Sequence, residues 1–345
     1  MKASLLLAAA ALAPAAVSAT ECSYCDYDDI NGKHQTTEIV KQQVGRQIIR
    51  QISDSITDHI AASVNNGFRT GPASTAGLNR LGASSDSGIG MNSAWDNFSW
   101  TRLEEDGLAT GVEVDMYQNS AGADLRFGNF IIGAALTYVN SDSMEGNFGA
   151  RLDNRTNTVE LTPYAAYIIN DNMFVSATTS YGYYNIDPTG ATLESEMEAY
   201  NSELALNGLH MIDKLSLRGK AGFRYQHWHT KNVNNTLGLR DSIDNWGFLA
   251  DAEIGYNVLD NLRTYTGAYF EYNDRVQPNQ ANLIITPATS QRPSGFGYGE
   301  SVFYFNAGID YYINKSLSVG AKYQTDLSDN VVDLHTVGLN VRLAM

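Results

Sequence analysis

The chain has no internal apolar run that approaches the roughly 18 residues a membrane-spanning helix requires. This absence excludes helical spans. It does not exclude a membrane protein that crosses with strands, because lipid-facing and lumen-facing residues alternate along such strands and their hydropathies cancel. The hydrophobic content of 43% therefore fits either a sheet protein in water or a barrel in a membrane.

Lysine and arginine are scarce as well. The chain has 23 of them against 38 aspartates and glutamates, which gives a formal net charge of −15. Binding to a phosphate backbone requires clustered basic residues, so we expect no nucleic-acid partner.

Motifs of catalysis are missing too. No G-x-S-x-G elbow occurs, and His227 and His229, on either side of Trp228, form no evident triad. Two histidines two residues apart on one strand face could bind a metal, but a place in an interfacial girdle or at the edge of a loop explains them more simply. We therefore expect no enzyme, no catalytic residues, no cofactor and no metal.

Only two cysteines are present, Cys22 and Cys25. They follow a segment that is typical of a secretory signal peptide, with Lys2 ahead of an apolar stretch and small residues at its end. We expect cleavage between Ala19 and Thr20, and hence an exported chain. In that setting a disulfide between Cys22 and Cys25 is the simplest prediction, because a structural zinc site needs four ligands.

Residues 36–64 predict a helix. Its apolar positions recur every three or four residues: Ile39, Val40, Val44, Ile48, Ile49, Ile52, Ile56, Ile60 and Val64. Thr36 or Thr37 can cap its start, and Asn65-Asn66-Gly67 ends it. Such an amphipathic helix either packs on another surface or on its own copy, or it lies in or at the mouth of a barrel lumen. Both interpretations stay open.

After a Gly/Ser-rich linker, the alternation of apolar and polar residues predicts twelve strands. We place them near 93–102, 114–127, 130–140, 156–169, 173–185, 193–212, 215–229, 243–259, 262–273, 300–313, 317–325 and 330–345. The last one shows the pattern best: Val337, Leu339, Val341 and Leu343 share one aliphatic face, because successive strand side chains point to opposite sides.

The connections between these strands alternate in length. Tight turns rich in Asn, Asp and Gly stand at 128–129, 170–172, 213–214, 260–261 and 314–316. These residue types tolerate the positive φ of short hairpins. The intervening connections are mostly longer, and only 326–329 is short. Short inner turns and long outer loops are typical of outer-membrane barrels. We predict an all-β fold: a twelve-stranded antiparallel transmembrane β-barrel, preceded by a short amphipathic helix, with both barrel ends on the periplasmic side.

The predicted faces agree with an apolar, lipid-facing outside and a polar, water-accessible inside. Charged residues fall opposite the aliphatic face: Asp124, Arg126, Arg218, Lys220, Arg224, Asp251, Glu253 and Asp310. On the lipid face an Arg or Lys near the midplane would cost about 2–4 kcal/mol. Tyrosines near strand ends suit aromatic girdles at both interfaces: Tyr138, Tyr167, Tyr256, Tyr272, Tyr311 and Tyr312.

A short motif recurs on these strands. The closing strand contains Thr336-x-Gly338-x-x-Val341-x-Leu343, and the same spacing appears from Ser120 to Phe127 and from Asn306 to Ile313. Its glycine falls on the lumen face, where it can admit a neighbouring aromatic ring.

Residues from about 95 to 345 resemble the autotransporter β-domain of Gram-negative bacteria. The features that carry the resemblance are this motif, the strand count, the alternating connections and Trp95 after the linker. The resemblance implies a type V secretion translocator barrel in the cell outer membrane, with the lipid bilayer, lipopolysaccharide, the barrel-insertion machinery and periplasmic chaperones as partners. Thr336, Gly338, Val341 and Leu343 are similar to the family's assembly signal, although the family usually ends on an aromatic residue and this chain ends on Met345.

The resemblance also sets the domain division. We expect a signal peptide at 1–19, a short passenger with helix and linker at 20–92, and the barrel at 93–345. Asn65-Asn66 resembles the paired asparagines at which some members cut their passenger, and a simple helix stop is the alternative. The expected function is to translocate or anchor the short N-terminal segment. The alternatives are a porin-like channel for small solutes, and a structural or adhesive protein that acts through outer loops such as 274–299.

Overall fold

A computed structural model describes residues 32–64, 89–106, 111–147, 150–189, 195–231, 242–276, 300–314, 317–327 and 332–344. Helix α1 spans Gly32–Val64. The strands are β1 (Ile89–Asp106), β2 (Gly111–Phe127), β3 (Phe130–Asn147), β4 (Ala150–Asn170), β5 (Met173–Thr189), β6 (Ser195–Ile212), β7 (Leu215–Lys231), β8 (Ser242–Leu259), β9 (Leu262–Val276), β10 (Glu300–Tyr312), β11 (Leu317–Asp326) and β12 (Val332–Ala344). The predicted helix and the twelve predicted strands are confirmed. α1 begins four residues earlier than expected, and β1 begins at Ile89 rather than at 93.

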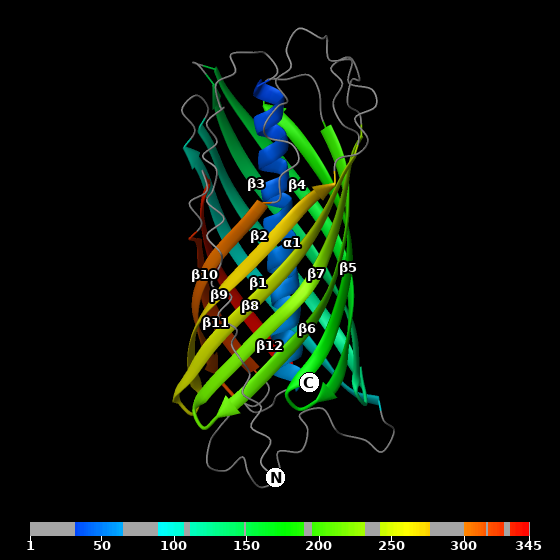
Figure 1. Cartoon of the computed structure of the whole chain (residues 1–345), viewed down its shortest axis with the longest axis vertical. Helices are drawn as coiled ribbons and strands as arrows, with labels where there is room; N and C mark the ends of the chain where they lie inside the picture. The colour runs from blue at the N-terminus through cyan, green and yellow to red at the C-terminus, as the bar shows by residue number, and fades with distance from the viewer. Residues whose placement is uncertain are drawn as a thin grey trace.

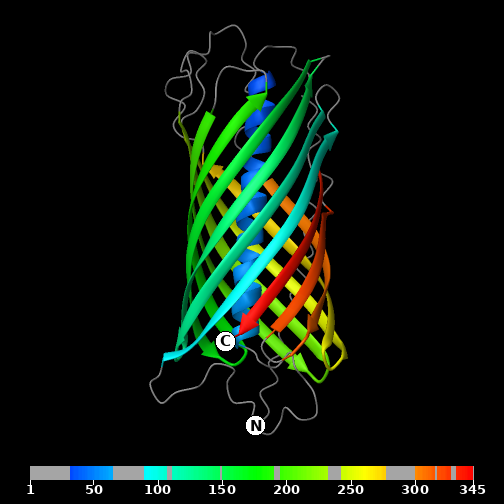
Figure 2. The same ribbon diagram turned by 180° about the vertical axis from the view of Figure 1, so that it is seen from behind.

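The strands close into one antiparallel barrel, each paired with its neighbours in the chain. The first and last strands complete it, in a register that runs from Ser93↔Ala344 to Glu105↔Val332. Figure 2 shows β1 in cyan beside β12 in red. Because a closed sheet has no edge, the backbone groups of the wall can all be paired, which a bilayer demands. The predicted fold class is confirmed.

The tight turns gather at one end of the barrel, where the C-terminus also lies (Figure 1). Two of them use the left-handed conformation that their residue types predicted, with φ of 60° at Gly128 and 54° at Asp213. In outer-membrane barrels the short turns face the periplasm, so we call this the inner end and the opposite end the outer end.

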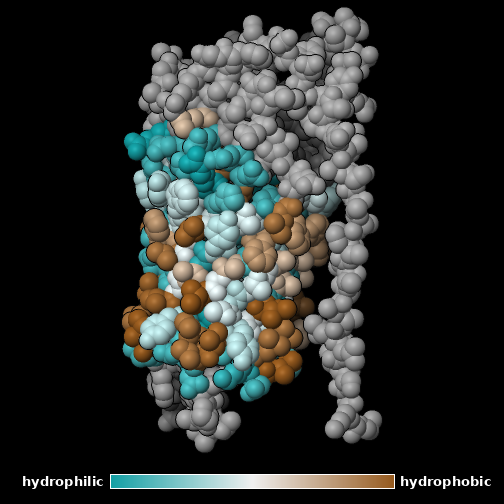
Figure 3. Space-filling view, turned by 90° about the vertical axis from the view of Figure 1, so that its left-hand side faces the viewer, coloured by the Kyte–Doolittle hydropathy of each residue, from teal (hydrophilic) through white to brown (hydrophobic). Residues whose placement is uncertain are grey.

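The two faces of the wall differ as predicted. On β3, Phe130, Ile132, Ala134, Leu136 and Tyr138 are all exposed on the outside, Leu136 to 56%. On β7, Lys220 and Arg224 are buried inside the barrel, Arg224 to 1% exposure. Figure 3 shows apolar residues gathered in the lower part of the described surface, below a hydrophilic zone. This band is the membrane-facing belt.

The tyrosines line two surfaces rather than one. Tyr138, Tyr167, Tyr256, Tyr272 and Tyr311 are exposed on the outside, as the girdle prediction requires. Tyr312 is a correction: it is only half-exposed, because it follows the outward Tyr311 and the strand alternates. A second set is buried inside the barrel: Tyr164, Tyr184, Tyr265, Tyr269 and Tyr304.

Helix α1 lies within the lumen along the barrel axis (Figures 1 and 2). No helix in the described ranges is both long enough and apolar enough to cross a bilayer by itself. Gln47 reaches Thr336 near the outer end, where β12 begins, and His59 reaches Ser93 near the inner end, where β1 begins. The helix therefore runs from the outer end toward the inner end. Of the two interpretations open from the sequence, the structure has the helix in the lumen.

Candidate functional site

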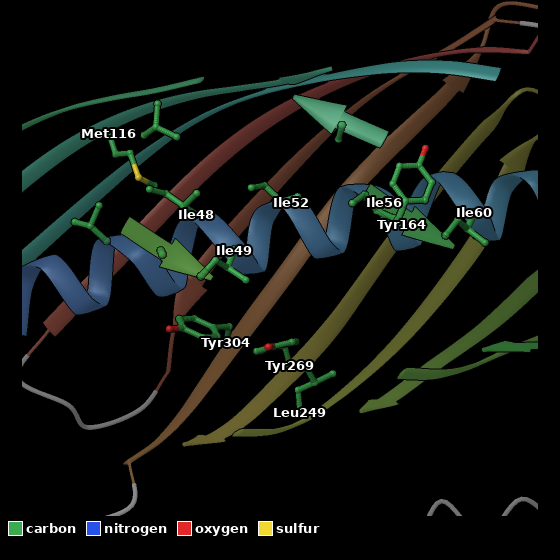
Figure 4. Packing of buried hydrophobic residues seen from close by; sticks show 14 of the residues in the cluster. Ile48, Ile49, Ile52, Ile56, Ile60, Met116, Tyr164, Leu249, Tyr269 and Tyr304 are labelled. Carbon is green, nitrogen blue, oxygen red and sulfur yellow. The ribbon is translucent and has the colours of Figure 1, made fainter. Parts of the chain in front are cut away.

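The candidate site is the contact between α1 and the inner wall. One side of the helix carries Ile48, Ile52, Ile56 and Ile60, which are 0–2% exposed. They belong to a buried apolar cluster with inward side chains of β2, β3 and β4, among them Met116, Ile131, Ala135, Val139, Tyr164 and Ala166. Figure 4 shows Ile48 beside Met116 and Ile60 near Tyr164. Apolar residues on the lumen face would be costly in a water-filled pore, so this part of the wall is built for a resident helix.

Gly45 marks the closest approach between helix and wall. A Cβ built on Gly45 would lie 1.7 Å from Cη2 of Trp228, on β7. Glycine inside a helix costs about 1 kcal/mol relative to alanine, so its presence here has a packing reason. The Trp228 ring also contacts Tyr184, with ring centroids 5.5 Å apart. Trp228 points inward, between the outward His227 and His229.

The other sides of α1 carry acidic and amide groups that meet the polar wall. Asp58 forms an ion pair with Arg218 of β7. Asp54 lies 3.9 Å from Nζ of Lys220 and 3.7 Å from Nζ of Lys322. Acidic groups on the helix thus face basic groups on β7 and β11.

Ser53 joins the same network through hydroxyl hydrogen bonds. Its Oγ donates to Oε1 of Glu203 at 2.7 Å, and Nζ of Lys220 donates to that Oγ at 2.9 Å. Breaking one partner of a buried pair costs several kcal/mol, because the other charge stays buried. The position of α1 is therefore specified along its length.

The wall also carries ion pairs that do not involve the helix. Arg224 lies between Glu203 and Glu271, with N–O distances of 2.7 and 3.0 Å. Arg263 joins Glu253 and Asp310, the second at 3.1 Å. These pairs set four inward carboxylates, on β6, β8, β9 and β10, against two guanidinium groups, and so offset part of the inward negative charge on this side of the lumen.

Hydrogen bonds tie α1 to both strands of the closure. Nε2 of Gln47 donates to Oγ1 of Thr336 on β12 at 2.9 Å, and Nε2 of Gln51 donates to Oγ1 of Thr101 on β1 at 2.8 Å. Nearer the inner end, Nδ2 of Asn97 donates to Oγ of Ser55 at 2.6 Å. The helix thus contacts the wall at the place where the last strand meets the first.

One buried cation on the helix is held by aromatic rings. The guanidinium of Arg50 lies 3.6 Å from the ring centroid of Tyr304 and 5.6 Å from that of Tyr269. Such a contact stabilises a cation with little access to water. It also explains two of the inward tyrosines.

One cavity beside the helix is small. A cavity of about 50 Å³ lies between α1 and strands β1, β11 and β12, lined by Asp54, Asp58, Lys322, Arg342 and Gly338 among others. It has room for a few water molecules. This volume is far below that of a pocket for a drug-sized ligand.

His59, Ser93 and Asp124 lie together at the inner end, yet their geometry is not that of a hydrolase. Nε2 of His59 lies 2.8 Å from Oγ of Ser93 and 2.7 Å from Oδ2 of Asp124, so one nitrogen contacts both groups. A Ser-His-Asp triad uses the two ring nitrogens separately. Within the described ranges no group of three or more His, Cys, Asp or Glu is placed to hold a metal ion.

The structure places the four predicted assembly-signal residues of β12 on two different faces of the wall. Thr336 and Gly338 face the lumen, and Gly338 lines the cavity. Val341 and Leu343 are exposed on the membrane-facing side. The positions Ala19, Thr20, Cys22, Cys25, Asn65 and Asn66 lie outside the described residues.

The glycine prediction holds at two of the three strict motif positions. A Cβ on Gly122 would lie 2.4 Å from the Trp95 ring, and one on Gly308 would lie 2.3 Å from the Tyr265 ring. Gly338 has no ring above it, and only ordinary contacts surround its Cβ position. At Gly338 the repeated spacing therefore has no packing cause of this kind.

Comparison with known proteins identifies the family. The model of the autotransporter β-domain family matches residues 97–324. No curated protein matches the chain in sequence. The translocator domain of autotransporter NalP from Neisseria meningitidis is similar in structure, with a TM-score of 0.56, 13% identity, and coverage of 90% of this chain and 98% of that one.

Two further solved structures are similar. The β-domain of the Bordetella autotransporter BrkA has a TM-score of 0.55 and 13% identity, and the alignment covers 74% of this chain and 100% of that one. The transport unit of the Escherichia coli autotransporter AIDA-I has a TM-score of 0.54 and 11% identity, with 83% and 98% covered. At these identities the likeness concerns the fold, while the family match covers most of the barrel. The chain belongs to the autotransporter β-domain family and is an outer-membrane β-barrel.

Proposed function

We propose that this barrel translocates a short N-terminal segment and then anchors it, with α1 as the part that remains in the lumen. The observation that carries the proposal is the direction of α1. α1 begins toward the outer end and ends toward the inner end, where β1 begins (Figure 1). If β1 begins at the periplasmic end, the segment before it passes outward through the lumen as α1. The residues that precede Gly32 are then delivered to the cell surface.

The fit of α1 supports long residence in the lumen. Its isoleucines face an apolar wall, Asp58 faces Arg218, and Gly45 lies against Trp228. These contacts are specific to one register and one direction of the helix. They favour an anchored end state over a segment in transit.

The domain division of this proposal is the one expected from the sequence. A signal peptide, 1–19, is removed after Ala19, and residues 20–92 form a short passenger, helix and linker, except that residues 89–92 already belong to β1. Cys22 and Cys25 form a disulfide in the exposed segment. Asn65 and Asn66 end the helix, and cleavage there would release the segment rather than anchor it.

Assembly of the barrel requires partners in this proposal. Periplasmic chaperones deliver the chain, and the insertion machinery reads Thr336, Gly338, Val341 and Leu343 on β12. Two observations support this role: β12 closes the barrel against β1, and Val341 and Leu343 lie on its outward face. Lipopolysaccharide and the bilayer then surround the belt.

A peptide tag inserted between Thr20 and Glu21 tests the proposal. On intact cells we expect an antibody to label this tag, and we expect no labelling of the same tag placed in the inner turn between Asp213 and Lys214. Both tags should be labelled equally in permeabilised cells. A tag after Thr20 that is hidden until the cells are permeabilised would refute surface display.

The porin-like alternative is tested by conductance in planar bilayers. Since α1 lies along the barrel axis and packs against the wall, the intact chain should conduct poorly. A steady open conductance like that of a chain lacking residues 32–64 would favour the channel. Adhesion through the outer loops, such as 274–299, is tested by deleting that loop and measuring attachment of cells.

A further inference from the structure

The sequence of α1 repeats every four residues. A β-branched apolar residue stands at every fourth position: Val40, Val44, Ile48, Ile52, Ile56, Ile60 and Val64. The four residues that end at Ile48 read Gly-Arg-Gln-Ile, and the next three sets of four read Ile-Arg-Gln-Ile, Ser-Asp-Ser-Ile and Thr-Asp-His-Ile. We call each of these sets a tetrad.

A helix with this repeat presents nearly the same surface after a step of one tetrad. The step is a movement of about 6 Å along the helix axis with a rotation of about 40°, which brings each residue to the place of the one four positions earlier. The isoleucines that end the tetrads are 0–2% exposed and follow one another along α1 in Figure 4. After a step toward the outer end, an isoleucine again meets the apolar wall at three of these four places. The apolar row therefore does not select one position of the helix by itself.

The two polar rows select it only in part. Every third tetrad position is polar and hydrogen-bonded to β12 or β1: Gln47, Gln51, Ser55 and His59. Every second position is charged: Arg46, Arg50, Asp54 and Asp58. A step toward the outer end would bring Asp54 to the place of Arg50, beside the ring of Tyr304, and Ala62 to the place of Asp58. At the other two places of the charged row, like replaces like.

The first tetrad position differs most between the tetrads. It is Gly45, Ile49, Ser53 and Thr57 in turn, and only the first of these lacks a side chain. A Cβ on Gly45 would lie 1.7, 2.5 and 2.6 Å from three carbons of the Trp228 ring. Trp228 is 3% exposed, and Tyr184 packs against it, so the ring has little room to move. A step toward the outer end would bring Ile49 into this place, where its side chain and the ring would overlap.

We propose that Gly45 is the positioning residue that sets where α1 comes to rest in the lumen. It acts through Trp228: the helix stops where the tetrad that begins with glycine lies against the ring. The inference rests on the proposed function in one respect, that α1 is the part of the segment retained in the lumen. Each step of one tetrad would change the length of chain beyond the outer end by four residues, so Gly45 also fixes the length that is displayed.

Moving the glycine by one tetrad tests the proposal. The test chain carries Gly45→Ile together with Ile49→Gly, and Cys22→Ser with Cys25→Ser removes the native thiols. The composition of the helix is unchanged by the exchange, but the tetrad that begins with glycine now lies one step closer to the inner end. We expect α1 to rest one step further toward the outer end, with position 49 against Trp228.

Two disulfides in native membranes report the position of the helix. Ser55→Cys with Asn97→Cys should form in the original position, where Nδ2 of Asn97 lies 2.6 Å from Oγ of Ser55. His59→Cys with Asn97→Cys should form only after the step. In the original position His59 contacts Ser93, which is four residues and about 13 Å from position 97 along β1. The exchanged chain should lose the 55–97 disulfide and gain the 59–97 disulfide.

Three control chains separate a shift from a loss of packing. Ile49→Gly alone keeps Gly45 against the ring and should keep the 55–97 disulfide, because the charged row opposes a step. Gly45→Ile alone should form neither disulfide. Adding Trp228→Ala to Gly45→Ile removes the obstacle and should restore the 55–97 disulfide. Heat-modifiable migration confirms that each chain contains a closed barrel before the disulfides are compared.

The results distinguish this inference from the proposed function. If the chain with only its native cysteines replaced forms the 55–97 disulfide, an exchanged chain that also keeps it, or forms neither disulfide, would overturn the role of Gly45 and leave the anchored helix in place. If the 55–97 disulfide is missing even with Gly45 and Ile49 unchanged, α1 does not occupy the lumen, and the proposed function fails together with the inference.

Discussion

The seating of α1 should depend on the contact between Gly45 and Trp228. In Gly45→Ala the new methyl carbon would start 1.7 Å from Cη2 of the ring, whereas two carbons rest about 3.5–4 Å apart. Helix or ring must therefore move by roughly 2 Å. Overpacking of this kind costs about 1–3 kcal/mol. The higher helix propensity of alanine does not offset this cost if α1 stays helical outside the lumen, because both states then gain equally.

The expected consequence is that α1 spends a larger fraction of time out of its packed position in the lumen. Each 1.4 kcal/mol changes an equilibrium about tenfold, so a cost of about 1–3 kcal/mol in Gly45→Ala should raise the fraction of time in a conducting state by about 5- to 140-fold. Single-channel recording in planar bilayers measures this fraction directly. The matched control is Gly208→Ala on β6, where a Cβ would meet nothing within 4 Å.

A double substitution decides whether the cause is this contact. Trp228→Ala removes the ring, so Gly45→Ala should add no further opening in the Trp228→Ala background. Two results would refute the role of the Gly45–Trp228 contact. One is a Gly45→Ala conductance equal to that of the original chain, and the other is a Gly45→Ala effect of equal size with and without Trp228→Ala.

Three further outcomes follow from the wall contacts. Asp58→Asn leaves Arg218 without its carboxylate and should destabilise the seated helix by about 3 kcal/mol, visible as faster hydrogen exchange of α1, while the charge exchange Asp58→Arg with Arg218→Asp should restore part of the protection. Deletion of residues 32–64 should give a folded barrel with a large steady conductance, and a deletion that stays closed would mean that something other than α1 blocks the pore. Gly122→Leu forces a side chain into the Trp95 ring and should lower the amount of heat-modifiable barrel in membranes, with Trp95→Ala restoring it.

Much of the wall could be predicted because successive side chains of a strand point to opposite faces, so each face appears in the sequence with a period of two. The alternation of Phe130, Ile132 and Leu136 predicts the outward face of β3, and all three side chains are exposed on the outside of the barrel. The positions of the tight turns could also be predicted, since Gly128 and Asp213 are residue types that adopt a positive φ.

The place of the helix could not be predicted from its own pattern. An isoleucine every fourth residue fits any apolar surface, whether a second helix or the inside of a barrel. The signal that could have found the site was in the wall. Ile131 stands between Phe130 and Ile132, so β3 is apolar on both faces there, and an aqueous lumen gives no reason for an inward isoleucine.

Other features depend on which residues meet, and a linear sequence does not contain that. Asp58 and Arg218 are far apart in the chain and come together only once the barrel is closed around the helix. Gly45 reads as a weak point in a helix until Trp228 is placed against it.

The presence and direction of α1 in the lumen are tested most directly by a short cross-linker between thiols, in a chain free of Cys22 and Cys25. Two pairs should be linked in native membranes, Gln47→Cys with Thr336→Cys and Ser55→Cys with Asn97→Cys, because each joins groups that are now hydrogen-bonded. The crossed pairs, 47 with 97 and 55 with 336, are about 12 Å further apart along the helix axis and should stay unlinked. Linkage of the crossed pairs would mean a reversed helix, and no linkage in any pair would mean a helix outside the barrel.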